Sequence, residues 1–240
     1  MGKEKNSRSG FTRGDLLVVV GCICLLAAVW IRPSLASSAA RSDEAVCANN
    51  LRHIGQGFLQ WAQDHEDSYG WWLPANSAAA TKNTPFHVEL WFQYFWVSNE
   101  LRSPRYLADP ADDFVYSRVA TNWGDQPGGL VNIGWRNNSI SYFLGLHATP
   151  LQPHSILAGD GNVQGGGIVG CSTGIRATDM RLNAIWPGTV HGDRGNLLFS
   201  DGRVEMTDTG RLREAVFWNP DSSPDGLGNW NMHFLKPRTP

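Results

Sequence analysis

The sequence predicts an α+β protein in which a long N-terminal helix packs against an antiparallel β-sheet. Three features predict this class. An unbroken apolar run covers residues 16–31, and an apolar stripe with helical spacing follows over residues 51–62. Short strand-like runs separated by turn residues fill the second half of the chain. The 26 glycines and 11 tryptophans among 240 residues are also typical of a turn-rich, β-leaning domain.

The apolar run from Leu16 to Ile31 predicts a membrane segment. As a helix its sixteen residues would span roughly 24 Å, which is short of the ~30 Å hydrocarbon core of a bilayer. Counting from Phe11 gives 21 residues and about 32 Å, so a transmembrane helix over residues 11–33 is expected. The basic excess before this run keeps the N-terminus in the cytoplasm and places the rest of the chain across the membrane.

Three interpretations of the N-terminus compete. A secretory signal would be cut near Ala36, a signal anchor would stay uncut, and a prepilin leader would be cut before the apolar run. The third is favoured by residues 9–12, Ser-Gly-Phe-Thr, which precede Asp15 and a Leu-Leu-Val-Val-Val run. This pattern resembles the prepilin motif of type IV pilins and type II secretion pseudopilins. The resemblance implies that a prepilin peptidase cuts between Gly10 and Phe11 and methylates Phe11.

Asp15 would be the fifth residue of the processed chain. A carboxylate close to a bilayer is costly unless it is paired, so it usually marks a functional contact. The resemblance implies that Asp15 pairs with the free N-terminal amine of the same or a neighbouring subunit; the alternative is a position at the lipid headgroups. The chain departs from the motif in two places. It has Asp15 where the family prefers glutamate, and Arg13-Gly14 where two apolar residues are usual.

The segment after the membrane predicts an amphipathic helix over residues 34–70. Its apolar stripe consists of Leu51, Ile54, Phe58, Trp61 and Ala62. Pro33 predicts a kink or a break before this helix, and Gly70 and Pro74 predict its end. Residues 47–56, Cys-Ala-Asn-Asn-Leu-Arg-His-Ile-Gly-Gln, resemble the post-membrane helix of a large bacterial pseudopilin-like family.

Residues 71–240 predict a β-rich head domain. Helices are expected at 89–96 and 210–218, a turn at 107–113, and an extended surface tail from Pro220. Strands are expected at 130–135, 140–146, 155–158, 196–200 and 203–207. Asp201-Gly202 between the last two strands predicts a hairpin with a type I′ turn.

His191 and Asp201-Gly202 are separated by nine residues. This spacing resembles the C-terminal His-x9-Asp-Gly signature of the same pseudopilin-like family, so the resemblance covers both ends of the chain. His191 with Asp193 and Asp201 is also a candidate group for acid–base chemistry or metal binding. The Asp-Gly pair is more typical of a turn, and no common hydrolase, metalloprotease or phosphate-loop motif occurs. We therefore expect no catalytic residues and no enzyme.

The cysteines leave two alternatives open. Cys22 and Cys24 lie in the apolar run and are expected to be apolar fillers, whereas Cys47 and Cys171 lie outside it. In an oxidising compartment Cys47 and Cys171 could form one disulfide; otherwise they are two buried free thiols.

No cofactor and no bound metal are expected, with a structural Ca²⁺ as the alternative. Two groups of acids supply the oxygens that Ca²⁺ prefers, Asp109 with Asp112 and Asp113, and Asp221 with Asp225. Neither group matches an EF-hand loop, so solvated turns are the competing interpretation.

Together the resemblances imply a pilin-like fold with a leader (1–10), a transmembrane helix (11–33), an amphipathic helix (34–70) and a head (71–240). They imply a structural subunit of a type II secretion or type IV pilus-like assembly. Its partners would be a prepilin peptidase, other pseudopilin subunits and the inner membrane, with the head in the periplasm or at the cell surface. A net charge of -2 predicts no nucleic-acid partner.

A recognition module is the alternative function. Five tryptophans could stack on the sugar rings of a glycan or another surface polymer if they were exposed: Trp71, Trp72, Trp91, Trp96 and Trp123. Burial in the core is the competing interpretation of these rings. A secreted hydrolase released by a cut near Ala36 is a third option.

Overall fold

The computed structural model describes residues 10, 12–74, 76–81, 89–165, 177–180, 183–218 and 232–237. The chain divides into two compact units, Met1–Ser42 and Asp43–Pro240. The second contains the sheet and is called the larger unit below.

Helix α1 spans Arg13–Gln63 and is one helix of 51 residues. Thr12 caps its start, because the Thr12 hydroxyl accepts a hydrogen bond from the Asp15 amide at 3.2 Å. In return the Asp15 carboxylate accepts from the Thr12 amide at 2.9 Å, which completes a capping box. The helix continues through Pro33, so a break there is wrong, while the alternative of a kink stays a prediction. It ends at Gln63, before the predicted limit of residue 70. Shortly after this end, Glu66 and Asp67 adopt positive φ.

The first part of α1 carries large apolar side chains on its surface. From Leu16 to Leu26 eight of them are 44–73% exposed. Within the residues that the structure describes, no helix combines the length and the apolar character needed to cross a membrane.

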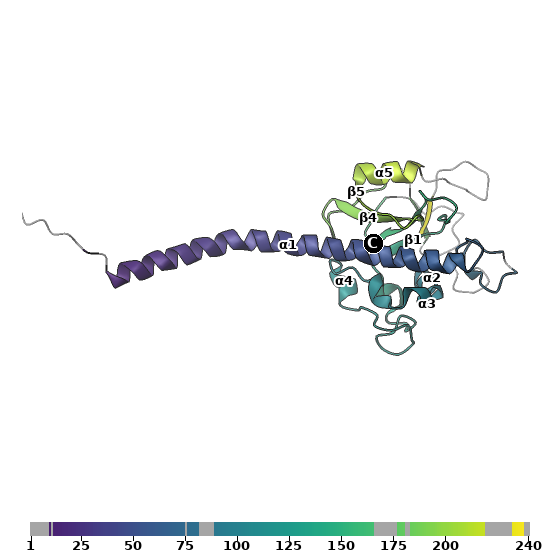
Figure 1. The fold of residues 1–240 in the computed structure, drawn as a ribbon, viewed down its shortest axis with the longest axis horizontal. Helices are drawn as coiled ribbons and strands as arrows, with labels where there is room; N and C mark the ends of the chain where they lie inside the picture. Colours follow the sequence, from purple (N-terminus) through teal and green to yellow (C-terminus); the bar gives the residue numbers. More distant parts are fainter. Residues whose placement is uncertain are drawn as a thin grey trace, which may run out of the picture. The chain divides into compact units, whose positions relative to one another are not determined.

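The larger unit is built on a six-stranded sheet with the order β3-β6-β1-β2-β4-β5. Strands β1, β4 and β5 of this sheet are labelled in Figure 1. All five strand pairings are antiparallel. The strands are β1 (Tyr142–Gly145), β2 (Ile156–Asp160), β3 (Ala177–Met180), β4 (Arg194–Phe199), β5 (Val204–Asp208) and β6 (Met232–Leu235). This topology confirms the predicted α+β class with an antiparallel sheet.

Four of the five predicted strands are confirmed, as β1, β2, β4 and β5. The predicted strand at 130–135 is wrong, because this segment forms turns before the 3₁₀ helix η3 (Arg136–Ser139). Asn132 explains the difference: its side chain accepts from the Gly134 amide at 2.9 Å and donates to the Asp125 carbonyl at 2.7 Å. Such local bonds compete with strand pairing.

Strand β6 was not predicted. It lies in the tail that was expected to be extended surface, and it pairs with both β1 and β3. Phe234 and Leu235 are 1% and 0% exposed. The expectation of a surface tail is therefore wrong for these residues.

The β4–β5 hairpin is confirmed, but its predicted type I′ turn is wrong. That turn needs positive φ at both central residues, and only Gly202 has it (84°), not Asp201. The Phe199 amide bonds the Arg203 carbonyl at 2.9 Å, and this bond closes a loop of three residues, 200–202. The Gly202 amide also bonds the Phe199 carbonyl at 2.9 Å. This is a type I turn followed by a left-handed glycine, the usual three-residue hairpin loop.

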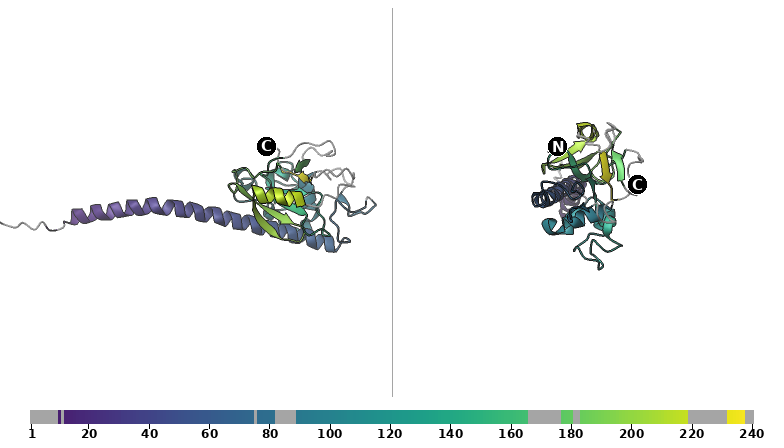
Figure 2. Two further views of the ribbon diagram at one scale, coloured as in Figure 1. Left: turned by 90° about the horizontal axis from the view of Figure 1, so that it is seen from above. Right: turned by 90° about the vertical axis from the view of Figure 1, so that its right-hand side faces the viewer.

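Both faces of the sheet are covered (Figures 1 and 2). On one face the part of α1 from Asp43 onward packs with α2 (Leu90–Trp96). On the other lies α5 (Thr209–Trp218). Short helices complete the unit: α3 (Ser98–Leu101), η2 (Pro104–Leu107) and α4 (Asp113–Tyr116). Helices α2 and α5 confirm the two helices predicted for the head.

The predicted stripe of α1 forms the core beneath the sheet. Its five members are at most 5% exposed: Leu51, Ile54, Phe58, Trp61 and Ala62. They belong to one apolar cluster with the sheet residues Tyr142, Leu144 and Leu198. Neighbouring positions on the same strands, such as Phe143 and Leu197, belong to the second cluster with α5. This alternation is what a two-sided sheet requires.

Candidate functional site

Four side chains that bind metals in other proteins meet inside the larger unit. They are Cys47 on α1, Asp109 after η2, Asp160 at the end of β2 and His191 before β4. One ligand atom from each lies within 4.8 Å of the other three. The side chain of His191 is 4% exposed, and the other three residues are buried. We call these four residues the buried tetrad.

Direct hydrogen bonds link the tetrad in two pairs. The Cys47 thiol donates to Asp160 Oδ1 at 3.1 Å. His191 Nε2 lies 2.8 Å from Asp109 Oδ2 and 3.9 Å from Asp160 Oδ2. The imidazole therefore stands between the two carboxylates.

A second layer of donors fixes these groups. The Asn196 amide on β4 donates to Asp160 Oδ2 at 2.7 Å, and the Asn196 side chain donates to Cys47 Sγ at 3.3 Å. The Ala111 amide donates to Asp109 Oδ1 at 2.9 Å. Cys47 and Asp160 are thus held by β4, and Asp109 is held by its own loop.

Helix packing, strand pairing and a hydrogen bond from a backbone amide position three of the four segments. Cys47 lies four residues before Leu51, so it continues the buried stripe of α1 by one helical turn. Asp160 pairs with Tyr142 at one end of the β1–β2 ladder. The Asp109 amide donates to the Ser141 hydroxyl at 3.0 Å, which ties the loop after η2 to the residue before β1.

Burial and mutual charge shift the pKa values of the tetrad. Burial raises the pKa of the Cys47 thiol well above its ordinary value, and the charges of Asp160 and Asp109 raise it further. Burial and the charge of Asp109 raise the pKa of Asp160 to about 6, although His191 opposes this shift. Burial alone would lower the pKa of His191, but its hydrogen bond with Asp109 and the nearby negative charges outweigh burial and raise it. These shifts favour a neutral thiol at Cys47 and an imidazolium at His191.

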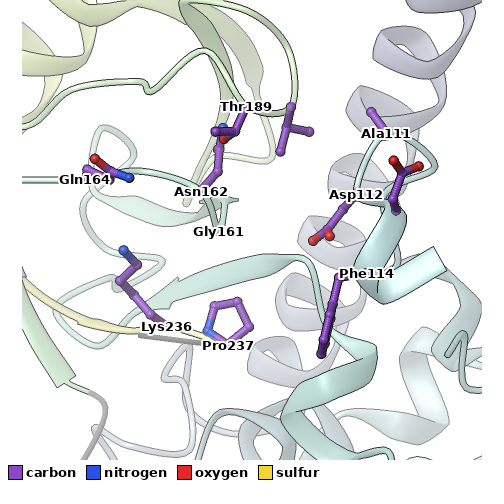
Figure 3. A pocket seen from close by; sticks show the side chains of 11 residues that line it. Ala111, Asp112, Phe114, Gly161, Asn162, Gln164, Thr189, Lys236 and Pro237 are labelled. Atoms are coloured by element: carbon purple, nitrogen blue, oxygen red, sulfur yellow. The ribbon is translucent and has the colours of Figure 1, made fainter. Parts of the chain in front are cut away.

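A cavity of about 440 Å³ is lined by residues that lie close to the tetrad residues in the sequence. Its lining includes Ala111, Gly161 and Val190, which lie within two residues of three tetrad members. Figure 3 shows Asp112 and Phe114 on one side of this cavity and Gln164 and Lys236 on the other. Asn162 also lines it, and both polar atoms of its side chain are buried without a hydrogen-bond partner.

The predicted site residues separate into two places. His191 and Cys47 belong to the tetrad. Asp201 and Gly202 form the hairpin tip instead, where Asp201 Oδ1 accepts from the Arg203 amide at 2.9 Å. This contact confirms that Asp201 serves the turn. Asp193, the other acid considered beside His191, is exposed.

The remaining predicted residues have varied outcomes. Gly10 and Asp15 are described, whereas Phe11 and Cys171 lie outside the described residues. Cys47 carries a free thiol, and its predicted disulfide with Cys171 stays a prediction.

Two members of the first predicted calcium group, Asp109 and Asp112, make contacts with different parts of the protein. Asp109 bonds His191, while Asp112 Oδ1 accepts from the Val115 amide at 3.3 Å and caps α4. The second group, Asp221 with Asp225, lies outside the described residues.

The tryptophans considered for glycan stacking are packed against the protein. Trp91 is 4% exposed, and the other four are partly buried. Those four donate their indole N–H to backbone carbonyls: Trp71 and Trp72 to Ala148, Trp96 to Ala79 and Trp123 to Arg102. These contacts favour the core interpretation of the aromatic content.

The fold and the site define an α+β protein with a two-sided antiparallel sheet and a buried Cys/His/Asp/Asp tetrad. No protein-family model matches the chain, and neither does any curated protein or solved structure.

Proposed function

We propose that this protein is a structural, pseudopilin-like subunit of a type II secretion or type IV pilus-like assembly, and not an enzyme. The observation that carries the proposal is the apolar surface of α1 between Leu16 and Leu26. Eight exposed large apolar side chains on one helical segment need lipid or other helices to cover them. In the proposed assembly, lipid covers this surface before assembly and neighbouring α1 helices cover it afterwards.

The capping box at the start of α1 supports the proposal. The Asp15 carboxylate accepts from the backbone amide and the hydroxyl of Thr12, at 2.9 and 2.8 Å. A cut between Gly10 and Phe11 would create a charged amine one residue before this amide. The carboxylate is thus placed at the end of the helix where the new amine would appear, as the pairing proposed for Asp15 requires.

Membrane anchoring is proposed from the sequence. The apolar run continues to Ile31, beyond the last exposed apolar side chain that the structure describes on this segment, Leu26. The proposed topology is a single inner-membrane pass with the larger unit in the periplasm or at the cell surface. A prepilin peptidase and other pseudopilin subunits would be its partners.

The mature N-terminus tests the proposal directly. Mass spectrometry of the protein isolated from its native membrane should find a chain that begins with N-methylated Phe11. Replacing Gly10 with valine should block the cut and leave residues 1–10 attached, which serves as the control. A mature chain that begins near Ser37 would contradict the proposal, because the apolar surface would then be removed.

Asp15 should matter for assembly and not for insertion. Asp15→Ala should leave the amount of membrane-bound protein unchanged and reduce incorporation into filaments about tenfold or more, because it removes a charge-assisted contact. Asp15→Glu keeps the carboxylate and should assemble normally. Both variants are compared by membrane fractionation and by quantifying sheared filaments. Equal incorporation of Asp15→Ala and wild-type chains would refute the paired-carboxylate argument.

A further inference from the structure

We propose that Cys47, Asp109, Asp160 and His191 bind one Zn²⁺ ion, which fastens α1 to the sheet. This inference does not depend on the proposed role in a filament. It rests on four side chains from four separate segments whose ligand atoms converge inside the protein.

The distances fit a four-coordinate ion. Zinc binds sulfur at about 2.3 Å and nitrogen or oxygen at about 2.0–2.2 Å, so the ligands of a tetrahedral site lie roughly 3–4 Å apart. In the tetrad, Cys47 Sγ lies 3.1 Å from Asp160, and His191 Nε2 lies 2.8 and 3.9 Å from Asp109 and Asp160. The other separations are at most 4.8 Å, so movements of about an ångström would place the four atoms at tetrahedral spacing around an ion.

The ligand set favours zinc over calcium and magnesium. Calcium and magnesium prefer sites made of oxygen atoms alone, and Ca²⁺ takes six to eight of them. A thiolate with an imidazole and carboxylates suits a borderline-soft ion that accepts four ligands, which is the chemistry of Zn²⁺. All four positions are filled by protein side chains, as in structural zinc sites, whereas catalytic sites keep one position for water.

The charge balance of the tetrad is compatible with a bound cation. Among the described residues, the ion pairs of Asp109 and Asp160 are formed with His191 alone. Two buried carboxylates therefore share one imidazole. Zinc would replace the protons on Cys47 and His191, so its double charge takes the place of those two protons and leaves the net charge of the tetrad unchanged.

The surroundings are those of a supported metal site. Ligands of structural metals are usually held by hydrogen bonds from a second layer. Asn196 provides such bonds to Cys47 and Asp160, and the Ala111 amide provides one to Asp109. A cavity is lined by Gly161 and Val190, the chain neighbours of Asp160 and His191.

A metal-free network is the competing explanation. In that case the Cys47 thiol keeps its bond to Asp160, and an imidazolium at His191 keeps its bond to Asp109. The two explanations differ in one measurable respect, namely whether the folded chain retains a metal ion through Cys47 and His191.

Zinc content provides the first test. The full-length chain, solubilised in detergent, is incubated with Zn²⁺, freed of excess ion by gel filtration and analysed by plasma mass spectrometry. We expect one zinc per chain, and a loss of at least tenfold in Cys47→Ser and His191→Gln. The matched controls are Cys22→Ser and His154→Gln, which change exposed residues and should retain the ion. Zinc-free wild-type protein, or equal zinc in the tetrad variants and controls, would overturn the proposal.

Cobalt gives a second test that needs no variant and so survives any failure of the variants to fold. Wild-type protein loaded with Co²⁺ should show the near-ultraviolet absorption of a cobalt–thiolate bond and the visible bands of a tetrahedral ion. Adding Zn²⁺ should remove both signals. A chain that binds cobalt without the thiolate absorption would exclude Cys47 as a ligand and overturn the proposal as stated.

Discussion

Replacing His191 with alanine should lower the free energy of unfolding by about 3–5 kcal/mol. The substitution leaves Asp109 and Asp160 buried side by side without the imidazole that pairs with both. Breaking a buried ion pair by removing one partner has a cost of this size, because the remaining charge is neither solvated nor compensated.

The measurement is urea unfolding of the full-length chain in detergent with EDTA present, so that no metal contributes. His154→Ala is the control, since His154 is exposed and should change stability by no more than about 0.5 kcal/mol. Asp109→Asn should then cost less in the His191→Ala background than in the wild type, because it removes one of the two uncompensated charges. Equal stability of the two histidine variants would refute charge pairing at the tetrad.

Replacing Leu51 with alanine should destabilise the protein by about 2–5 kcal/mol. Leu51 is 0% exposed and belongs to the core between α1 and the sheet, so the substitution leaves a cavity that rigid neighbours fill only in part.

Leu151→Ala is the matched control, because the same substitution is made at a side chain that is 74% exposed. It should change the free energy of unfolding by no more than about 0.5 kcal/mol. Both variants are compared with wild type by the midpoint and slope of urea unfolding. Similar values for the two leucines would mean that the α1 stripe is not the core of the larger unit.

The parts of the fold that depend on local spacing could be predicted from the sequence. The α1 stripe follows from apolar residues at helical spacing, and Leu51, Ile54 and Phe58 are buried as expected. The β4–β5 hairpin follows from Asp201-Gly202 between two strand-like runs, although the sequence did not reveal a third loop residue.

The errors arise where other contacts decide the local structure. Residues 130–135 have the apolar content of a strand, but the side chain of Asn132 bonds nearby backbone and favours turns. Strand β6 is short and follows a segment rich in glycine and proline. Its pairing with β1 and β3 brings together residues that are far apart in the chain, which no local pattern shows.

The tetrad was also beyond local patterns, although its members lie in notable segments. Cys47 and His191 lie in the two segments with a pseudopilin-like pattern, and Asp109 lies in the predicted turn at 107–113. Asp160 stands two residues after the predicted strand at 155–158. No local pattern in these segments indicates that the four side chains meet, and only the fold brings them together.

The place of β6 has a consequence for how the protein is made. Because β6 lies between β1 and β3, the sheet cannot close until residue 235 has left the ribosome and reached the compartment where the protein folds. Until then β1 presents an unpaired edge, which is a site for aggregation. A chain that ends before β6, for example after a premature stop codon, should therefore keep this unpaired edge and aggregate more readily than the full-length chain.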